Sequence, residues 1–85
     1  MKRYEYREQI YRILRAADRP LSSEEIYAKL KETDNNLYDK MGRVFIKSNH
    51  NAPAQQIGGM LGYDAVYGQH IIKIDGNPVM WLWKE

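Results

Sequence analysis

The side chains with the clearest chemical potential lie between residues 40 and 56. Lys40, Arg43 and Lys47 follow one another without an acidic residue up to residue 51, and His50 lies beside them. Residues 1–39, in contrast, mix eight bases with eight acids. An unopposed run of bases is either a solvated face or a surface that attracts an anionic partner. Because this run leads directly into the stretch "NAPAQQIGG", we favour a contact surface.

Three other chemistries find little support in the sequence. His50 and His70 lie 20 residues apart in a chain without cysteine, which is a poor basis for a metal site. The serine pair 22–23 suits a helix cap and has no catalytic triad around it. The glycines of residues 58–62 do not form a phosphate-binding loop, because no Lys-Ser or Lys-Thr pair follows them. We therefore expect no enzymatic activity, no cofactor and no small-molecule substrate.

Length and composition limit the class of protein. Eighty-five residues make one domain, 1–85, with one thin core and little room for a deep cleft. No apolar run approaches the roughly 20 residues that span a bilayer, and the charged start "MKRYEYREQ" is not followed by the apolar segment of a signal peptide. We expect a cytoplasmic binding module without membrane contact.

Local signals predict two helices in the first part of the chain. Apolar residues recur at helical spacing in "YEYREQIYRILRAADRP", and Pro20 closes that segment. Ser22 and Glu25 have the spacing of a capping box, which predicts a second helix over about residues 23–32. Leu21, just before it, is expected to form a one-residue strand bridge that pins the far edge of a hairpin.

Residues 37–48 fit two kinds of structure. Leu37, Met41 and Val44 follow helical spacing, and the three bases would then share the polar side. Gly42 weakens a helix, however, and "RVFIK" would also suit a strand. We favour a helix.

A further helix is expected from Ala52, and it contains two adjacent glycines. Each glycine costs about 1 kcal/mol against Ala inside a helix. The spacing places Gly58 on the buried side, where it allows another helix to approach, and Gly59 on the exposed side, where it allows a partner to approach the backbone. The alternative is that Gly59 and Gly62 simply end the helix as C-caps.

The C-terminal stretch "QHIIKIDGNPVMWLWKE" predicts a β-hairpin, because alternating residues flank the turn signal "DGNP". One face of the hairpin must cover the helices, and the residues expected there are Ile72, Ile74, Val79, Trp81 and Trp83. The opposite face is also apolar, and the residues expected there are Ile71, Met80 and Leu82. Such a two-faced sheet favours a protein partner or a homodimer that docks on the hairpin.

Three stretches together resemble the winged-helix branch of the helix-turn-helix proteins, over nearly the whole chain. "ILRAADRPLSSEEIYAKL" looks like the first two helices, "APAQQIGGML" is similar to the third, and "HIIKIDGNPVMWLW" resembles the two wing strands. The 20 residues 33–52 exceed the usual turn, so the turn is stretched or an extra helix is inserted. The resemblance implies an α+β winged helix with three or four helices followed by a C-terminal β-hairpin wing.

The same resemblance implies that the protein binds double-stranded DNA and regulates transcription. The third helix would enter the major groove, where a glutamine amide can bond bidentately to adenine, and the basic run would meet phosphates. The residues expected to bind nucleic acid are Lys40, Arg43, Lys47, Asn49, His50, Asn51, Gln55, Gln56, Gly59 and Lys73. The alternative is a winged-helix module for protein interaction or dimerisation without nucleic acid, which the apolar hairpin and the acidic second helix favour.

Overall fold

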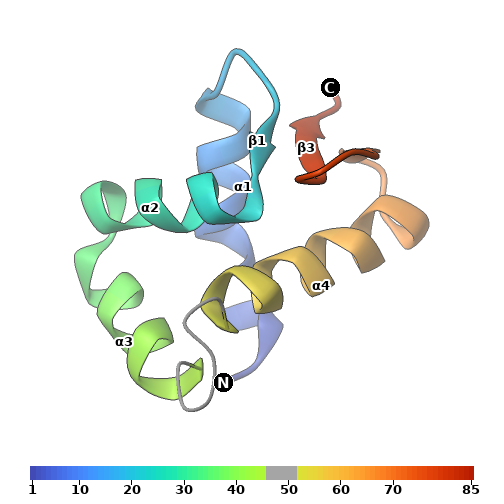
Figure 1. Ribbon diagram of the computed structural model, residues 1–85. Helices are drawn as coiled ribbons and strands as arrows, with labels where there is room; N and C mark the ends of the chain where they lie inside the picture. Colours follow the sequence, from blue (N-terminus) through green and yellow to red (C-terminus); the bar gives the residue numbers. More distant parts are fainter. Residues whose placement is uncertain (46–51) are drawn as a thin grey trace.

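The computed structural model describes residues 1–45 and 52–85, and Figure 1 shows their arrangement. In chain order the elements are the 3₁₀-helix η1 (Arg3–Glu5), α1 (Arg7–Ala16), β1 (Leu21–Ser22), α2 (Ser23–Thr33), α3 (Asn35–Phe45), α4 (Ala52–Tyr67), β2 (Ile71–Ile74) and β3 (Met80–Trp83). Helices followed by a C-terminal hairpin confirm the predicted α+β class. Within the described ranges, no helix is both long and apolar enough to cross a membrane.

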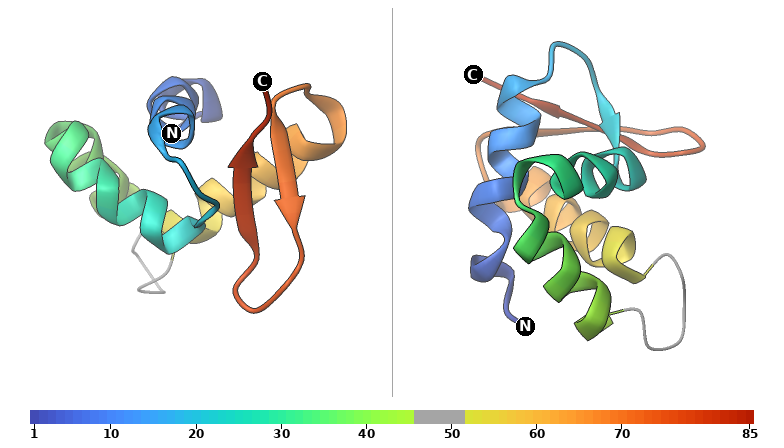
Figure 2. Two further views of the ribbon diagram at one scale, coloured as in Figure 1. Left: turned by 90° about the horizontal axis from the view of Figure 1, so that it is seen from above. Right: turned by 90° about the vertical axis from the view of Figure 1, so that its left-hand side faces the viewer.

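The three short strands form one antiparallel sheet in the order β1-β3-β2. Leu21 pairs with Trp81 and Ser22 with Met80, so β1 adds to the far side of the hairpin as expected, with two residues in place of one. The sheet contacts α1 through β3 and α4 through β2. Figure 2 shows the hairpin on one side of α1 and the pair α2 and α3 on the other.

The predicted capping box at the start of α2 is present. The Glu25 backbone N–H donates to Ser22 Oγ at 3.1 Å, and the Ser22 N–H donates to Glu25 Oε1 at 3.0 Å. Both bonds satisfy donors that the first helical turn leaves without an internal partner. Because Ser22 is also the last residue of β1, this cap fixes the angle at which α2 leaves the sheet.

Residues 35–45 form the helix α3, which confirms the helical interpretation of the described part of segment 37–48. Met41 is fully buried and anchors α3 to the core. The long connection between the second and the last helix therefore contains an inserted helix. α4 continues for 16 residues, so the alternative in which Gly59 and Gly62 end it is wrong.

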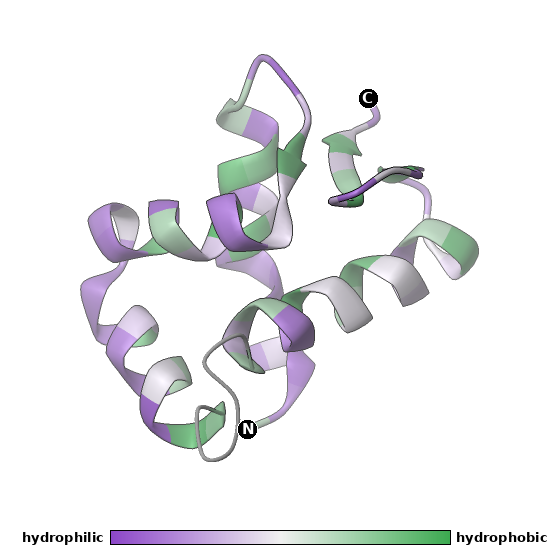
Figure 3. Ribbon diagram, viewed as in Figure 1, coloured by the Kyte–Doolittle hydropathy of each residue, from purple (hydrophilic) through white to green (hydrophobic). Residues whose placement is uncertain are grey.

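The core lies where α1, α2 and α4 meet the covered face of the sheet. Its largest fully buried side chains are Tyr6, Ile10, Leu14, Leu21, Ile26, Leu30, Met41, Ile57, Met60 and Leu61. Figure 3 shows hydrophilic residues along the outer turns of α2 and α3, whereas most of α4 is apolar or neutral. The spacing of these side chains is helical in α1, α2 and α4, which is why the helix predictions were reliable.

The predicted faces of the hairpin need one correction. Ile71 lies opposite Trp83, so it belongs to the covered face, where it is 6% exposed. Ile72 and Ile74 lie opposite Leu82 and Met80 on the outer face. Both expected sets are therefore wrong, since Ile72 and Ile74 do not share a face with Trp81 and Trp83, and Ile71 does not share one with Met80 and Leu82. The five residues between the strands bring odd-numbered positions opposite odd-numbered ones and even-numbered positions opposite even-numbered ones.

Candidate nucleic-acid interface

One side of α4 faces solvent along its whole length, and we call it the outer face. Its residues are Gln55, Gln56, Gly59, Gly62, Tyr63, Val66 and Tyr67. Gln55, Gln56 and Gly59 are exposed, as the helical spacing predicts, and Tyr63, Val66 and Tyr67 are more than half exposed. The outer face carries no charged side chain, because the one charged residue of α4, Asp64, is buried.

Asp64 ties the inner side of α4 to α1. Arg7 donates from Nη2 to Asp64 Oδ1 at 3.1 Å and from Nε to Oδ2 at 3.2 Å, and the Tyr11 hydroxyl donates to Oδ2 at 2.6 Å. Burial and the hydrogen bond to Asp64 raise the pKa of Tyr11 to about 12, which keeps the phenol neutral. The same carboxylate raises the pKa of Arg7 through its hydrogen bond. The network therefore fixes the rotation of α4 about its axis and with it the direction of the outer face.

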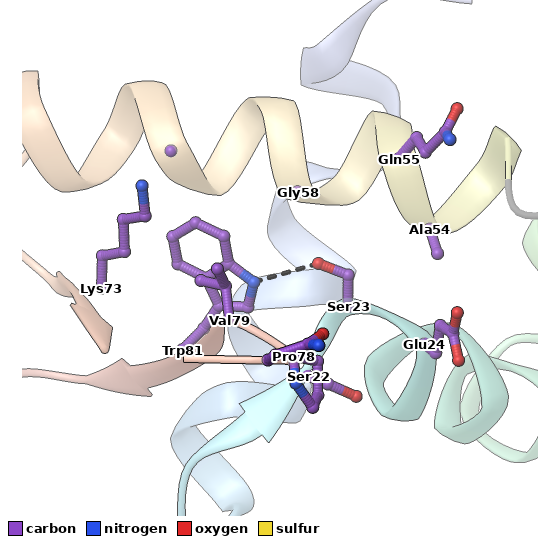
Figure 4. Close-up of a pocket in the computed structure, with 12 residues that line it drawn as sticks. Ser22, Ser23, Glu24, Ala54, Gln55, Gly58, Lys73, Pro78, Val79 and Trp81 are labelled. Atoms are coloured by element: carbon purple, nitrogen blue, oxygen red, sulfur yellow. Dashed lines mark hydrogen bonds between the residues drawn. The ribbon is translucent and has the colours of Figure 1, made fainter. Parts of the chain in front are cut away.

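A groove of about 680 Å³ is lined by α4, the start of α2 and the hairpin, and we call it the hairpin groove. Among its lining residues are Ser23, Gln55, Gly58, Lys73, Asn77 and Trp81. Within this groove Trp81 Nε1 donates to Ser23 Oγ at 3.0 Å, which joins the hairpin to the start of α2 (Figure 4). Figure 4 shows Lys73 extended toward α4 from the hairpin side. The structure thus places two of the predicted site residues, Gln55 and Lys73, along one groove.

The opposite flank of the outer face is formed by η1. The guanidinium carbon of Arg3 lies 5.9 Å from the centroid of the Tyr63 ring, and Tyr63 in turn contacts Tyr67 with a centroid distance of 4.7 Å. A Cβ at Gly59 would lie 3.4 Å from Arg3 Nη2. An uncharged helix face is therefore flanked by a cation on each side, Lys73 on the hairpin and Arg3 on η1.

The predicted basic run is less free to contact a partner than its sequence indicates. Lys40 Nζ lies 3.1 Å from Glu5 Oε1, in an ion pair that joins α3 to η1. The pKa of Glu5 is lowered by the backbone hydrogen bond from Lys2 and by the hydrogen bond from Lys40, so this carboxylate is ionised at neutral pH. Arg43 is exposed on α3. The remaining predicted residues of the run, Lys47, Asn49, His50 and Asn51, lie outside the described residues.

Two features of this region were not predicted from the sequence. Arg3 was one of several mixed charges near the N-terminus, and nothing local indicates that η1 lies beside α4. Asp64, in contrast, had a signal: it falls on the buried stripe of the helix, seven residues after Ile57. A carboxylate in that position requires a partner inside the protein.

In the described part of the chain, no three His, Cys, Asp or Glu residues lie close enough together to hold a metal ion. Comparison with known proteins gives no relative: no family model, no curated protein and no solved structure matches this chain.

Proposed function

We propose that this protein is a winged-helix protein that binds double-stranded DNA, with α4 in the major groove. The order of the elements supports this proposal, because β1 lies between α1 and α2 and the sheet order is β1-β3-β2, with α3 as an insertion. In this proposal the protein acts in the cytoplasm as a regulator of transcription and catalyses no reaction.

The observation that carries the proposal is the uncharged outer face of α4 between two cationic flanks. The major groove is about 12 Å wide and admits one helix, while phosphates line both of its edges. Lys73 on one side of α4 and Arg3 on the other would meet those two rows of phosphates. Gly59 and Gly62 would let the backbone of α4 approach the base edges closely.

Within this arrangement Gln55 is the residue proposed to contact a base. It is exposed in the first turn of α4 and lies beside the hairpin groove. Its amide can donate to one edge atom of adenine and accept from another. Because Lys40 is paired with Glu5, we propose that Arg43 contributes more to the phosphate contacts from α3.

The proposal is tested by fluorescence anisotropy with a mixed-sequence duplex at several salt concentrations. Arg3→Ala and Lys73→Ala should each weaken binding to all sequences and reduce the slope of log affinity against log salt by about one. Lys29→Ala on α2 removes the same charge away from α4 and is the matched control. Slopes that change equally in all three variants, or in none, would contradict the proposed contact surface.

One observation favours a second candidate, a protein-interaction module that does not bind nucleic acid. The C-terminal half of the outer face carries Tyr63, Val66 and Tyr67, and the last two are 72% and 73% exposed. A protein partner that covers these apolar side chains would bind as well or better in high salt, whereas phosphate contacts weaken steeply. The salt series therefore separates the two candidates.

A further inference from the structure

β2 has an unpaired edge. It pairs with β3 on one side, and no strand of the described chain pairs with its other side. The Lys84 N–H donates to the His70 carbonyl at 2.6 Å, so in the alternating pattern of an antiparallel pair Ile72 and Ile74 also bond to β3. Within β2 the backbone N–H and C=O groups of Ile71 and Lys73 consequently point away from the sheet, and Asp75 directly follows the end of the strand. Such a free row can pair with a further strand.

Apolar side chains lie along this same edge. On the outer face of the sheet Ile72 and Ile74 are 37% and 38% exposed, next to the half-buried Met80 and Leu82. A second hollow of about 610 Å³ runs between the end of α4 and β2, and both Val66 and Ile72 line it. Exposed apolar surface that continues across two elements is typical of an interaction site.

The charges on the edge indicate which strand fits it. Lys73 and Asp75 are the charged residues between positions 71 and 78, and their side chains are 49% and 91% exposed. Their own contact is loose, with Lys73 Nζ 3.8 Å from Asp75 Oδ1. In a symmetric antiparallel pair each contact away from the twofold axis occurs twice. A strand with one base and one acid two residues apart can therefore place its base opposite the acid of its copy, and its acid opposite the base.

Only some registers use this complementarity. If Lys73 faced Lys73 of a second copy, two like charges would lie directly opposite each other, which disfavours pairing. If Ile74 faces Ile74 of the second copy, Lys73 lies opposite Asp75 of the second copy, and the reciprocal pair forms as well. In this register residues 73 and 75 would be the hydrogen-bonded positions, which uses the outward-pointing backbone groups of Lys73 and extends β2 by one residue to Asp75.

We propose that a second copy of this chain pairs antiparallel with the free edge of β2, with Ile74 at the twofold axis and two reciprocal pairs of Lys73 with Asp75. Lys73 takes part in both proposals, because it is also a proposed phosphate contact, but the dimer is tested without DNA. Asp75→Lys lies outside the proposed DNA contacts and tests the dimer separately, and Arg3→Ala lies outside β2 and tests the DNA contacts separately.

Sedimentation velocity over a concentration series tests the charge pairs. Lys73→Asp and Asp75→Lys should each raise the dissociation constant of the dimer at least about ten-fold, because two attractions become two repulsions. The double reversal should return it to within about three-fold of the wild-type value. Lys29→Asp carries the same charge change on α2 and should leave the dimer intact. A monomer at every concentration, or a double variant that stays as weak as the single ones, would overturn the proposal.

A cysteine test reads the register directly and does not rely on charge. The chain has no cysteine, so Ile74→Cys introduces a single thiol. At the twofold axis this thiol would face its own copy in a non-hydrogen-bonded pair, close enough for a disulfide on mild oxidation. Ile72→Cys is the matched control, because its copy would lie four residues away, about 13 Å along the strand. Equal cross-linking of both variants, or none with Ile74→Cys, would contradict the register.

Discussion

The two sides of α4 differ in almost every physical respect. On the inner side Ile57, Met60 and Leu61 are fully buried, and Asp64 is held by three hydrogen bonds from α1. On the outer side the helix carries glycines, amides and aromatic rings that no part of the core requires. The inner side thus sets the position of the helix, and the outer side is free to serve binding.

This difference has a simple energetic basis. Burial of an apolar side chain stabilises the fold by about 1.5 to 3 kcal/mol. Removal of a buried carboxylate lowers stability further, because its hydrogen-bond partners are left unpaired. An exposed side chain away from such features contributes within about 0.5 kcal/mol. Substitutions on the two sides should therefore separate stability from binding, and the following predictions test that separation.

The largest effect is expected from Asp64→Ala. It leaves the Arg7 guanidinium and the Tyr11 hydroxyl without their shared acceptor, so the free energy of unfolding should fall by about 2 to 3 kcal/mol. The Arg7 side chain is 33% exposed, and solvation keeps the loss below that of a fully buried pair. Urea denaturation measures the change. Gln55→Ala on the outer side is the control and should alter stability by less than about 0.5 kcal/mol; equal losses would contradict the comparison.

The same network predicts a loss of stability at alkaline pH. The pKa of Tyr11 is about 12 in the folded protein, against about 10 for a tyrosine in an unfolded chain. Between these values the unfolded state releases the proton that the folded state retains, so stability falls as the pH rises. Burial also raises the pKa values of Tyr6 and Tyr27, which contribute in the same direction.

Thermal melts between about pH 10 and 12 check this prediction. Tyr11→Phe should show a shallower decline of melting temperature than the wild type. Phenylalanine has no phenol proton to release, so Tyr6 and Tyr27 remain as the tyrosines that link stability to pH. Tyr4→Phe, whose ring is 75% exposed, is the control and should decline like the wild type. A Tyr11→Phe curve parallel to the wild-type curve would show that Tyr11 is not linked to folding.

The sequence predicted the features of the fold that depend on neighbours along the chain. The capping box of Ser22 and Glu25, the start of α4 at Ala52 and the hairpin around "DGNP" each rest on local chemistry within a few residues. The covered face of the hairpin was mispredicted at Ile71, Ile72 and Ile74, because alternation defines two faces but does not say how the two strands are aligned. That alignment depends on the turn and on packing against α4.

In the candidate site, too, local patterns predicted what depends on one helix and failed for contacts between distant segments. Helical spacing placed Gln55 and Gly59 outward correctly, because one periodicity governs the whole helix. It could not reveal that Lys40 pairs with Glu5, 35 residues away, or that Arg3 lies beside Gly59. Both contacts depend on where η1 packs, and no local pattern in "MKRYEYREQ" determines that position.

A smaller effect is expected from Gly58→Ala, at the boundary between the two sides. Its Cβ would lie 3.1 Å from Ser23 Oγ, which the bond from Trp81 Nε1 holds in place. Overpacking should exceed the gain in helix propensity, so stability should fall by about 1 kcal/mol. In a Ser23→Ala background the clashing oxygen is absent, and the same substitution should become neutral or stabilising. A loss of the same size in both backgrounds would mean that Ser23 is not the obstacle.

The smallest effect, and the one of opposite sign, is expected from Gly59→Ala on the outer face. The nearest atom to the new Cβ is the flexible end of Arg3 at 3.4 Å, so helix propensity should dominate and stabilise the free protein by up to about 1 kcal/mol. Thermal melts give this value, and the anisotropy assay should show weaker duplex binding by the same variant, because the methyl group keeps the α4 backbone away from the bases. A stabilised variant that binds DNA as well as the wild type would place the contact surface elsewhere than the middle of α4. A destabilised one would mean that Arg3 is packed too firmly against the helix to move, and the outer face would then share the constraints of the inner one.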